Sequence, residues 1–267
     1  MLRDWIYDHP TWEVGTIIIA FSVLASWIGL YFFDRFVNVS IRSRHNDVAG
    51  FIIAIIGVVY AVLLAFIAVA AWASFDSADH VVQQEANLVG NLYRDSIAIP
   101  EPARSEMRAD IKQYLDLVIT KEWPAQREHR LNTQAWMAVE KLHGAITGID
   151  AKTLGQSVVE AEMLKTLNDL YNARRSRILA ADDGIPNTIW WILVLGGIIT
   201  VGFSFFFGMP NMKMHYAMTG LLAASMALVM VLIVALDWPF RGQVSISPEA
   251  YQAVQQDMAQ QNQQAQK

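Results

Sequence analysis

Apolar residues are concentrated in four long blocks, which alternate with polar segments. The blocks cover residues 14–33, 48–75, 185–207 and 216–236, and none of them contains a charged side chain. Because a helix needs about 20 apolar residues to cross a bilayer, the pattern predicts four transmembrane helices. The first block is too long for the apolar core of a signal peptide and follows an acidic leader, so we interpret it as a retained span.

The segment between the second and third blocks, residues 74–183, is polar and carries apolar residues at helical spacing. Val82, Val89 and Leu92 form a first stripe. Three further stripes are Met107, Ile111, Tyr114 and Val118; Trp136, Val139, Leu142 and Ile146; and Leu164, Leu167, Tyr171 and Ile178. Four helices return the chain to the side it left, which predicts an antiparallel bundle. The expected fold class is an all-α integral membrane protein with four transmembrane helices and a helical bundle inserted between the second and third.

The expected organisation has five parts. Residues 1–47 hold the first transmembrane helix and a basic link, 48–75 the second transmembrane helix, 74–183 the extramembrane bundle, 185–236 the third and fourth transmembrane helices, and 237–267 a C-terminal segment with a Gln-rich tail. The tail is low in complexity. We expect it to fray or to be disordered, although "SP" at 247–248 also suits the start of a short helix.

One side of the second block consists almost entirely of small residues. Steps of three and four positions connect them along the helix: Gly50, Ala54, Gly57, Ala61, Ala65, Ala68 and Trp72. Such a face lets another helix approach closely, and it also suits the wall of a narrow pore. Packing within one subunit and lining of a pore both remain open as interpretations.

The second block passes into the polar segment without a stop signal, since no Pro or Gly lies between Ala65 and Val89. We therefore predict an unbroken helix through residues 71–82. A helix over residues 49–99 would be about 75 Å long at 1.5 Å per residue. A rod of this kind would couple the membrane-spanning part mechanically to the bundle.

Asp76, Asp79 and His80 follow the second block within about one helical turn. In an oligomer they would form a ring at a pore mouth, where acidic groups attract cations and repel anions. A solvated helix face just beyond the lipid explains the same residues, because exposed charges on helices are common. A ring that binds cations and an ordinary solvated face are both retained as interpretations.

Three other charged positions have an expected structural role. Glu85 and Arg94 lie on the opening helix of the bundle, and we expect Arg94 to pair with an acidic residue such as Glu122. Such a buried pair fixes register more reliably than it adds stability. Asp237 ends the fourth span at the interface; the functional alternative is that it meets an Arg of the bundle and closes a gate.

Composition excludes several classes of protein. The net charge of −5 gives no basic face for nucleic acid, and the absence of Cys excludes disulfides, thiolate metal sites and cysteine nucleophiles. No phosphate-binding loop, nucleophile elbow or metalloprotease motif occurs in the sequence. We therefore expect no enzyme, catalytic residue, metal site or cofactor. The four blocks also contain no ionisable group of the kind on which transporters usually depend.

Short loops carry the signal for orientation. The link after the first block holds Arg35, Arg42 and Arg44, and the link between the last two holds Lys213. By the positive-inside rule both links face the cytoplasm, and the bundle then lies outside. The margin is small, because further arginines precede the third block on the bundle side.

Four stretches together resemble the bacterial bestrophin-like family of unknown function: "LLAFIAVAAWASFDSA", "EANLVGNLYRD", "IPEPARSEMRADIKQYLDLVITKEWP" and "ALDWPFRGQVSISPEAY". The resemblance runs from the first span to about Tyr251. It implies a distant similarity to bestrophins, which are pentameric anion channels whose second membrane helix lines the pore. It also implies a bacterial inner-membrane protein with its large domain in the cytoplasm, which conflicts with the charge count, so orientation stays open.

Two functions follow from these observations. The first is an oligomeric bestrophin-like ion channel, in which the small face of the second span lines a pore and the acidic turn forms its mouth. Four spans of one chain do not readily enclose a hydrated pore, so this hypothesis requires several copies. The alternative is a membrane-anchored helical sensor or scaffold protein. The expected partners are the lipid bilayer, further copies of the chain in a homo-oligomer such as a pentamer, and small ions, but not nucleic acid.

Overall fold

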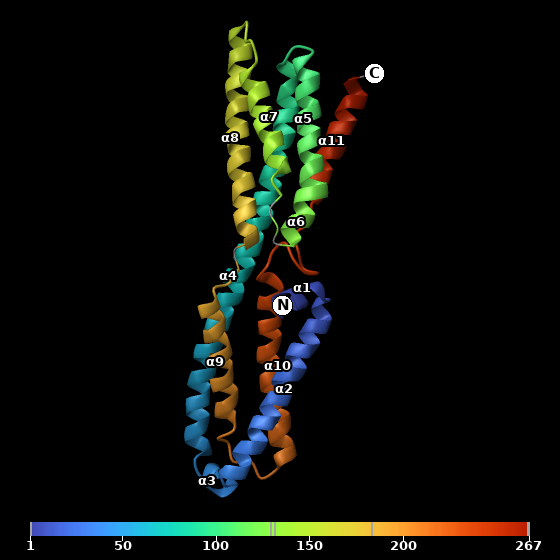
Figure 1. Ribbon diagram of the computed structural model, residues 1–267. Coiled ribbons are helices and arrows are strands. Elements are labelled where there is room, and N and C mark those ends of the chain that lie inside the picture. The colour runs from blue at the N-terminus through green and yellow to red at the C-terminus, as the bar shows by residue number, and fades with distance from the viewer. Residues whose placement is uncertain (1, 129, 131, 183, 266–267) are drawn as a thin grey trace. The chain divides into compact units, whose positions relative to one another are not determined.

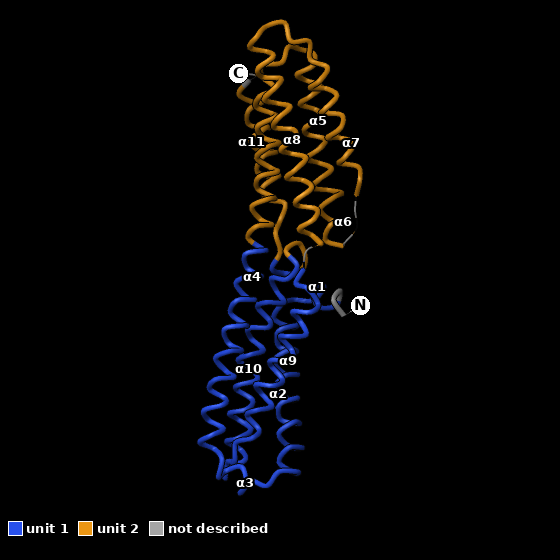
Figure 2. Tube along the Cα trace, turned by 90° about the vertical axis from the view of Figure 1, so that its left-hand side faces the viewer, with its two compact units in different colours: residues 1–75, 184–238, 242–244 blue, residues 76–183, 239–241, 245–267 orange. Residues whose placement is uncertain are grey.

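The structure is a computed structural model that describes residues 2–128, 130, 132–182 and 184–265. Every regular element in these residues is helical, so the predicted all-α class is confirmed. The chain divides into two compact units (Figure 2). Unit 1 contains residues 1–75, 184–238 and 242–244, and unit 2 contains residues 76–183, 239–241 and 245–267.

Unit 1 is the apolar unit. Its helices are α1 (Leu2–Asp8), α2 (Thr11–Phe36), α3 (Val39–Ser43), the first part of α4 (Asn46–Asp95), α9 (Asn187–Ser204) and α10 (Met212–Leu236). Four helical runs of the described chain are long and apolar enough to cross a membrane, and they contain α2, α4, α9 and α10. Within this unit α10 packs along α2, and α9 follows α4 (Figure 1).

Tyr60 of α4 connects three helices of unit 1. Its ring lies over Gly196 and Gly197 of α9, and its hydroxyl donates to Leu193 O at 2.7 Å. A Cβ at position 196 would come within 2.5 Å of the ring, so only glycine permits this approach. Tyr60, Leu193 and Ile233 of α10 form one buried apolar cluster. This cluster determines which side of α4 is covered by its own chain.

Unit 2 is a helical bundle. It holds the second part of α4, η1 (Ser96–Ala98), α5 (Ala103–Leu117), the π-helical turn η2 (Val118–Glu122), α6 (Trp123–Arg127), α7 (Gln134–Thr147), α8 (Leu154–Asp182) and α11 (Glu249–Ala265). The chain stays helical from α5 through η2 to Arg127. Pro124 lies directly after the π-helical turn η2, and a local irregularity of this kind accommodates a residue without a backbone N–H.

The helix predicted through residues 71–82 is confirmed, because α4 continues without interruption from Asn46 to Asp95. The change from apolar to polar side chains does not end it, since both sequences are good helix formers and each finds its own partners. In unit 2 the inner side of α4 is buried through Val82, Val89 and Leu92. These three residues are the stripe that the sequence assigned to the first bundle helix.

The expectation of a disordered C-terminal tail is wrong for the described residues. Residues 249–265 form α11, which packs on α4 and α5 in unit 2, while residues 266–267 lie outside the described part. Tyr251 and Met258 are buried, and Asn262 accepts a hydrogen bond from the hydroxyl of Tyr93 at 2.6 Å. The few apolar residues of the tail recur at helical spacing, and the surrounding glutamines mask this pattern.

Candidate functional site

The membrane part of α4 has one covered side and a wide uncovered one. Tyr60 and Leu64 are buried in the core of unit 1. On the far side Phe51, Ile55 and Phe66 expose 65–76% of their surface. Apolar side chains of this size at helical spacing need lipid or another helix, because a patch of this kind is rarely left in water.

The small face lies beside this uncovered side. Nothing lies within 4 Å of the place where a Cβ would stand at Gly50 or Gly57. Ala54 and Ala61 are exposed, and only Ala68 reaches the apolar cluster around Tyr60. The interpretation that this face packs tightly within one subunit is therefore wrong. The small face is therefore free either to pack closely against a second copy of the chain or to line a lumen.

The acidic turn after the membrane part is largely exposed. Asp76 and His80 lie on one face, with His80 Nε2 3.6 Å from Asp76 Oδ2, and both side chains are more than half exposed. Asp79 is half-buried and accepts a hydrogen bond from Gln83 at 2.7 Å. In the described residues no three His, Asp or Glu side chains are grouped to hold a metal. The geometry suits a diffuse acidic surface.

A charged cluster lies inside unit 2, around Glu85 of α4. Glu85 Oε1 accepts a hydrogen bond from the hydroxyl of Tyr114 in α5 at 2.5 Å, and Oε2 accepts from Arg177 Nε in α8 at 2.7 Å. Arg177 NH2 lies 3.3 Å from Oε1. All three side chains are fully buried. One carboxylate thus joins three helices of the bundle.

A second ion pair extends the cluster. Arg174 NH1 donates to Glu122 Oε2 at 2.6 Å, and Arg177 NH2 lies 3.4 Å from the same oxygen. Arg177 NH1 also donates to Gln126 Oε1. The expected partner of Glu122, Arg94, is exposed on α4, so that predicted pair is wrong. Arg174 takes its place because α8 faces the interior of the bundle at this level.

The cluster contains two carboxylates and two guanidinium groups. Burial opposes the charged form of Arg177, but Glu85, Tyr251 and Glu122 together outweigh it and raise the pKa of Arg177 well above its ordinary value. Burial, aided by the charge of Glu85, raises the pKa of Tyr114 well above its ordinary value. Burial and the same charge also raise the pKa of Tyr251 in α11. Both phenols therefore remain neutral at physiological pH.

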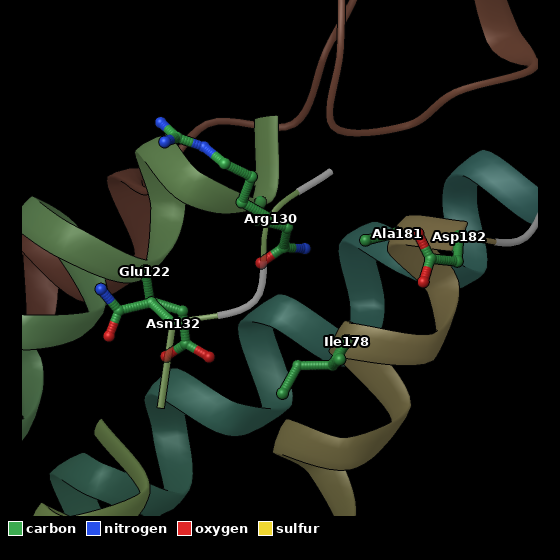
Figure 3. Close-up of a pocket in the computed structure, with 7 residues that line it drawn as sticks. Glu122, Arg130, Asn132, Ile178, Ala181 and Asp182 are labelled. Atoms are coloured by element: carbon green, nitrogen blue, oxygen red, sulfur yellow. The ribbon is translucent and has the colours of Figure 1, made fainter. Parts of the chain in front are cut away.

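A small cavity of about 30 Å³ borders the cluster (Figure 3). Glu122 and Gln126 form one wall, and Ile178, Ala181 and Asp182 of α8 form another. The volume is sufficient for a water molecule. The cavity is too small for an organic substrate, which needs roughly 300 Å³ or more. It gives no support to an enzymatic site.

Asp237 has a local structural role in unit 1. Its Oδ1 accepts a hydrogen bond from the backbone N–H of Ile185 at 2.5 Å, just before the start of α9, and its side chain is buried. A carboxylate at this position satisfies a backbone donor and complements the helix dipole. Its action as a gate stays a prediction.

Sequence analysis missed two buried polar residues at the linked end of unit 1, where the links at residues 37–45 and 205–211 lie. Arg42 donates to Asp34 and to Phe205 O. His215 is buried with Nε2 3.1 Å from Ser204 O. The predicted span began at residue 216, whereas α10 begins at Met212, so His215 lies inside the helix. Both side chains bind carbonyls at the C-terminal end of α9, where positive charge is favoured.

A detectable signal existed for the charged cluster. Arg174 and Arg177 continue the apolar stripe that includes Leu167 and Leu170 at steps of three and four, and therefore occupy core positions. A charged residue in an apolar stripe implies a buried partner. The identity of that partner depends on the rotation of the neighbouring helices, which no local pattern determines.

Comparison with known proteins agrees with this architecture. A family model described as the Bestrophin-like domain matches residues 20–251. A mutant of a bacterial bestrophin homologue from Klebsiella pneumoniae has a similar structure, with a TM-score of 0.68, 12% sequence identity, and coverage of 92% of this chain and 99% of that chain. A second mutant of that homologue gives a TM-score of 0.67 at 13% identity, with 91% and 96% covered.

A further structure, described as a membrane protein, has a TM-score of 0.61 at 14% identity and covers 90% of this chain and 95% of that chain. No curated protein matches the sequence significantly. At such low identity the structural matches show the fold, and the family rests on the match over residues 20–251. The resemblance read from the sequence is therefore confirmed, and the chain belongs to the Bestrophin-like family.

Proposed function

We propose that this protein is an ion channel built from several copies of the chain, with the membrane part of α4 around the central axis. The observation that carries the proposal is the uncovered side of α4. Its small face is open at Gly50 and Gly57, and its far side exposes large apolar residues. One chain leaves this helix half covered, and a ring of copies would cover it.

The chemistry of α4 supports a conduit. Residues 48–75 contain no Asp, Glu, His, Lys or Arg, so they offer no charged side chain that would hold a passing ion. The small face of the seven residues named above would line the pore, and Asp76, Asp79 and His80 would surround its mouth. The structural neighbours include a bacterial bestrophin homologue. The resemblance to bestrophins favours a pentamer. The expected location is the bacterial inner membrane.

The first test is the mass of the purified protein in mild detergent, corrected for bound detergent. A ring of four or more copies is expected. A monomer or a simple dimer would contradict the channel, because neither provides an axial pore. That result would favour the alternative of a membrane-anchored sensor or scaffold, in which α4 connects a membrane anchor to the bundle.

Ala61→Cys is expected to make flux through liposomes sensitive to a charged thiol reagent. The protein has no native Cys, so the reagent attacks only the introduced site. A positive charge attached to the small face should narrow the pore and repel cations. Phe21→Cys on α2, whose side chain is exposed on another helix, is the matched control. Equal loss of flux in both variants, or in neither, contradicts a pore lined by this face.

Asp76→Asn together with Asp79→Asn is expected to shift ion selectivity away from cations. The acidic side chains would otherwise concentrate cations at the mouth, and their effect should weaken at high ionic strength. The measurement is the reversal potential in a bilayer with asymmetric salt. Glu128→Gln, an exposed acid elsewhere in unit 2, serves as the control. An unchanged reversal potential would reject the ring of acidic residues.

A further inference from the structure

Glu85 fixes the direction of one side of α4 within unit 2. Its carboxylate receives the Tyr114 hydroxyl at 2.5 Å and two nitrogens of the Arg177 guanidinium at 2.7 and 3.3 Å. A planar guanidinium that binds both oxygens of a carboxylate restricts orientation as well as distance. Because these partners lie on α5 and α8, the carboxylate is held from two directions.

The apolar contacts of α4 provide much less orientation. Around Glu85 its buried side carries Ala78, Val82, Ala86 and Val89, which are short side chains. Such residues define rotation only weakly, because cores of similar volume tolerate repacking. Buried polar groups, in contrast, are known to specify register in helical assemblies. The charged cluster therefore distinguishes one rotation of α4 from another around Glu85, and the Tyr93–Asn262 hydrogen bond acts further along the same helix.

We propose that Glu85 and Arg177 are positioning residues that set the rotation, about the helix axis, of the part of α4 that belongs to unit 2. The pair thereby determines the direction in which this part of α4 presents the acidic turn of Asp76, Asp79 and His80. The consequence for ions rests on the proposed function, whereas the rotation itself does not. The pair acts as a brace, because its hydrogen bonds join α4 to α8 inside the bundle.

Two half-buried residues allow this rotation to be measured. Asp79 and Leu88 are nine positions apart, which is two and a half helical turns, so they lie on opposite sides of α4. Because the chain has no Cys, Asp79→Cys and Leu88→Cys each give one reactive thiol. The measurement is the rate of maleimide labelling of the full-length protein in detergent, with and without Glu85→Gln.

Rotation predicts opposite changes at the two sites. In the Glu85→Gln background one thiol should react several-fold faster and the other several-fold more slowly. General loosening of the bundle would raise both labelling rates together. If α4 keeps its rotation without the Glu85 carboxylate, neither labelling rate would change. Either of those results overturns the proposal. Asp110→Asn is the matched control, because this buried carboxylate binds Lys141 between α5 and α7 at 2.5 Å.

A charge-balanced variant guards against loss of folding. Glu85→Gln with Arg177→Gln leaves no uncompensated charge from this pair, and the opposite changes in labelling are expected there too. Wild-type labelling in the double variant would overturn the proposal. Opposite labelling changes without any ion flux in the parent protein would retain the brace and reject the channel. Ion flux in the parent protein together with unchanged labelling in the variants would retain the channel and reject the brace.

Discussion

Arg177→Met is expected to lower the free energy of unfolding by about 3–5 kcal/mol, the usual cost of leaving one partner of a buried ion pair without compensation. Arg177 is fully buried and supplies the two nitrogens that bind Glu85. Methionine has a similar length and fills much of the space. The expected loss of stability therefore comes from the Glu85 carboxylate, which is left without its cation, and from the lost hydrogen bond to Gln126.

Thermal unfolding in detergent measures this effect. Arg175→Met is the matched control, since the neighbouring side chain on the same helix is exposed. Its expected change is within about 0.5 kcal/mol, as for ordinary surface substitutions. If the two variants unfold at the same temperature, the buried pair does not contribute as its geometry indicates.

A second comparison separates charge from packing. Glu85→Leu combined with Arg177→Met removes both charges, and apolar replacement of a buried pair is often neutral or stabilising. The double variant should therefore be more stable than Arg177→Met alone. Equal or lower stability would mean that the hydrogen bonds of Tyr114 and Gln126, rather than the uncompensated charge, dominate the cost.

Gly208→Ala is expected to have the second large effect, at the linked end of unit 1. A Cβ at this position would overlap the backbone N of Ser43 and lie 2.7 Å from its Cα and 2.8 Å from Arg42 C. These are backbone atoms of α3, so a change of side-chain rotamer cannot relieve the clash. The amide of Asn46 also forms a hydrogen bond with each backbone group of Gly208, at 2.9 and 3.1 Å.

Overpacking costs about 1–3 kcal/mol, and occasionally more, and a clash with backbone atoms places this variant at the upper end. The expected result is a lower unfolding temperature and a smaller folded fraction in size-exclusion chromatography. Gly202→Ala on α9 is the control, because its Cβ would meet no atom within 4 Å. In a helix that change should be neutral or stabilising by up to about 1 kcal/mol. Similar behaviour of the two variants would contradict the close approach at Gly208.

The sequence predicted the spans better than the sites. Charge-free apolar blocks of about 20 residues have essentially one stable conformation in lipid, because each backbone polar group needs an internal partner. The unbroken α4 was also predictable, because no Pro or Gly interrupts the chain where the apolar block passes into the polar segment. The predicted partner of Glu122 was wrong, because ion pairs depend on the rotation of helices that are distant in the chain.

The C-terminal helix illustrates the limit of local patterns. Its low complexity indicated disorder, yet Tyr251 and Met258 reach the core of unit 2. An isolated helix of this length is marginal in water, and most of its stability comes from the surface on which it packs. The composition of the tail describes its exposed side and says little about the surface that α4 and α5 provide.

By itself, the sequence determined the helical class, the four apolar spans, the continuous α4 and the family, because each follows from local composition or from quoted motifs. The tertiary structure decided which sides of α4 are covered, and it showed that the small face is not packed inside one subunit. It also decided that Arg174 and Arg177, not Arg94, meet the buried carboxylates. Such choices depend on the angles between helices, and these are set by packing over the whole unit rather than by any short stretch of chain.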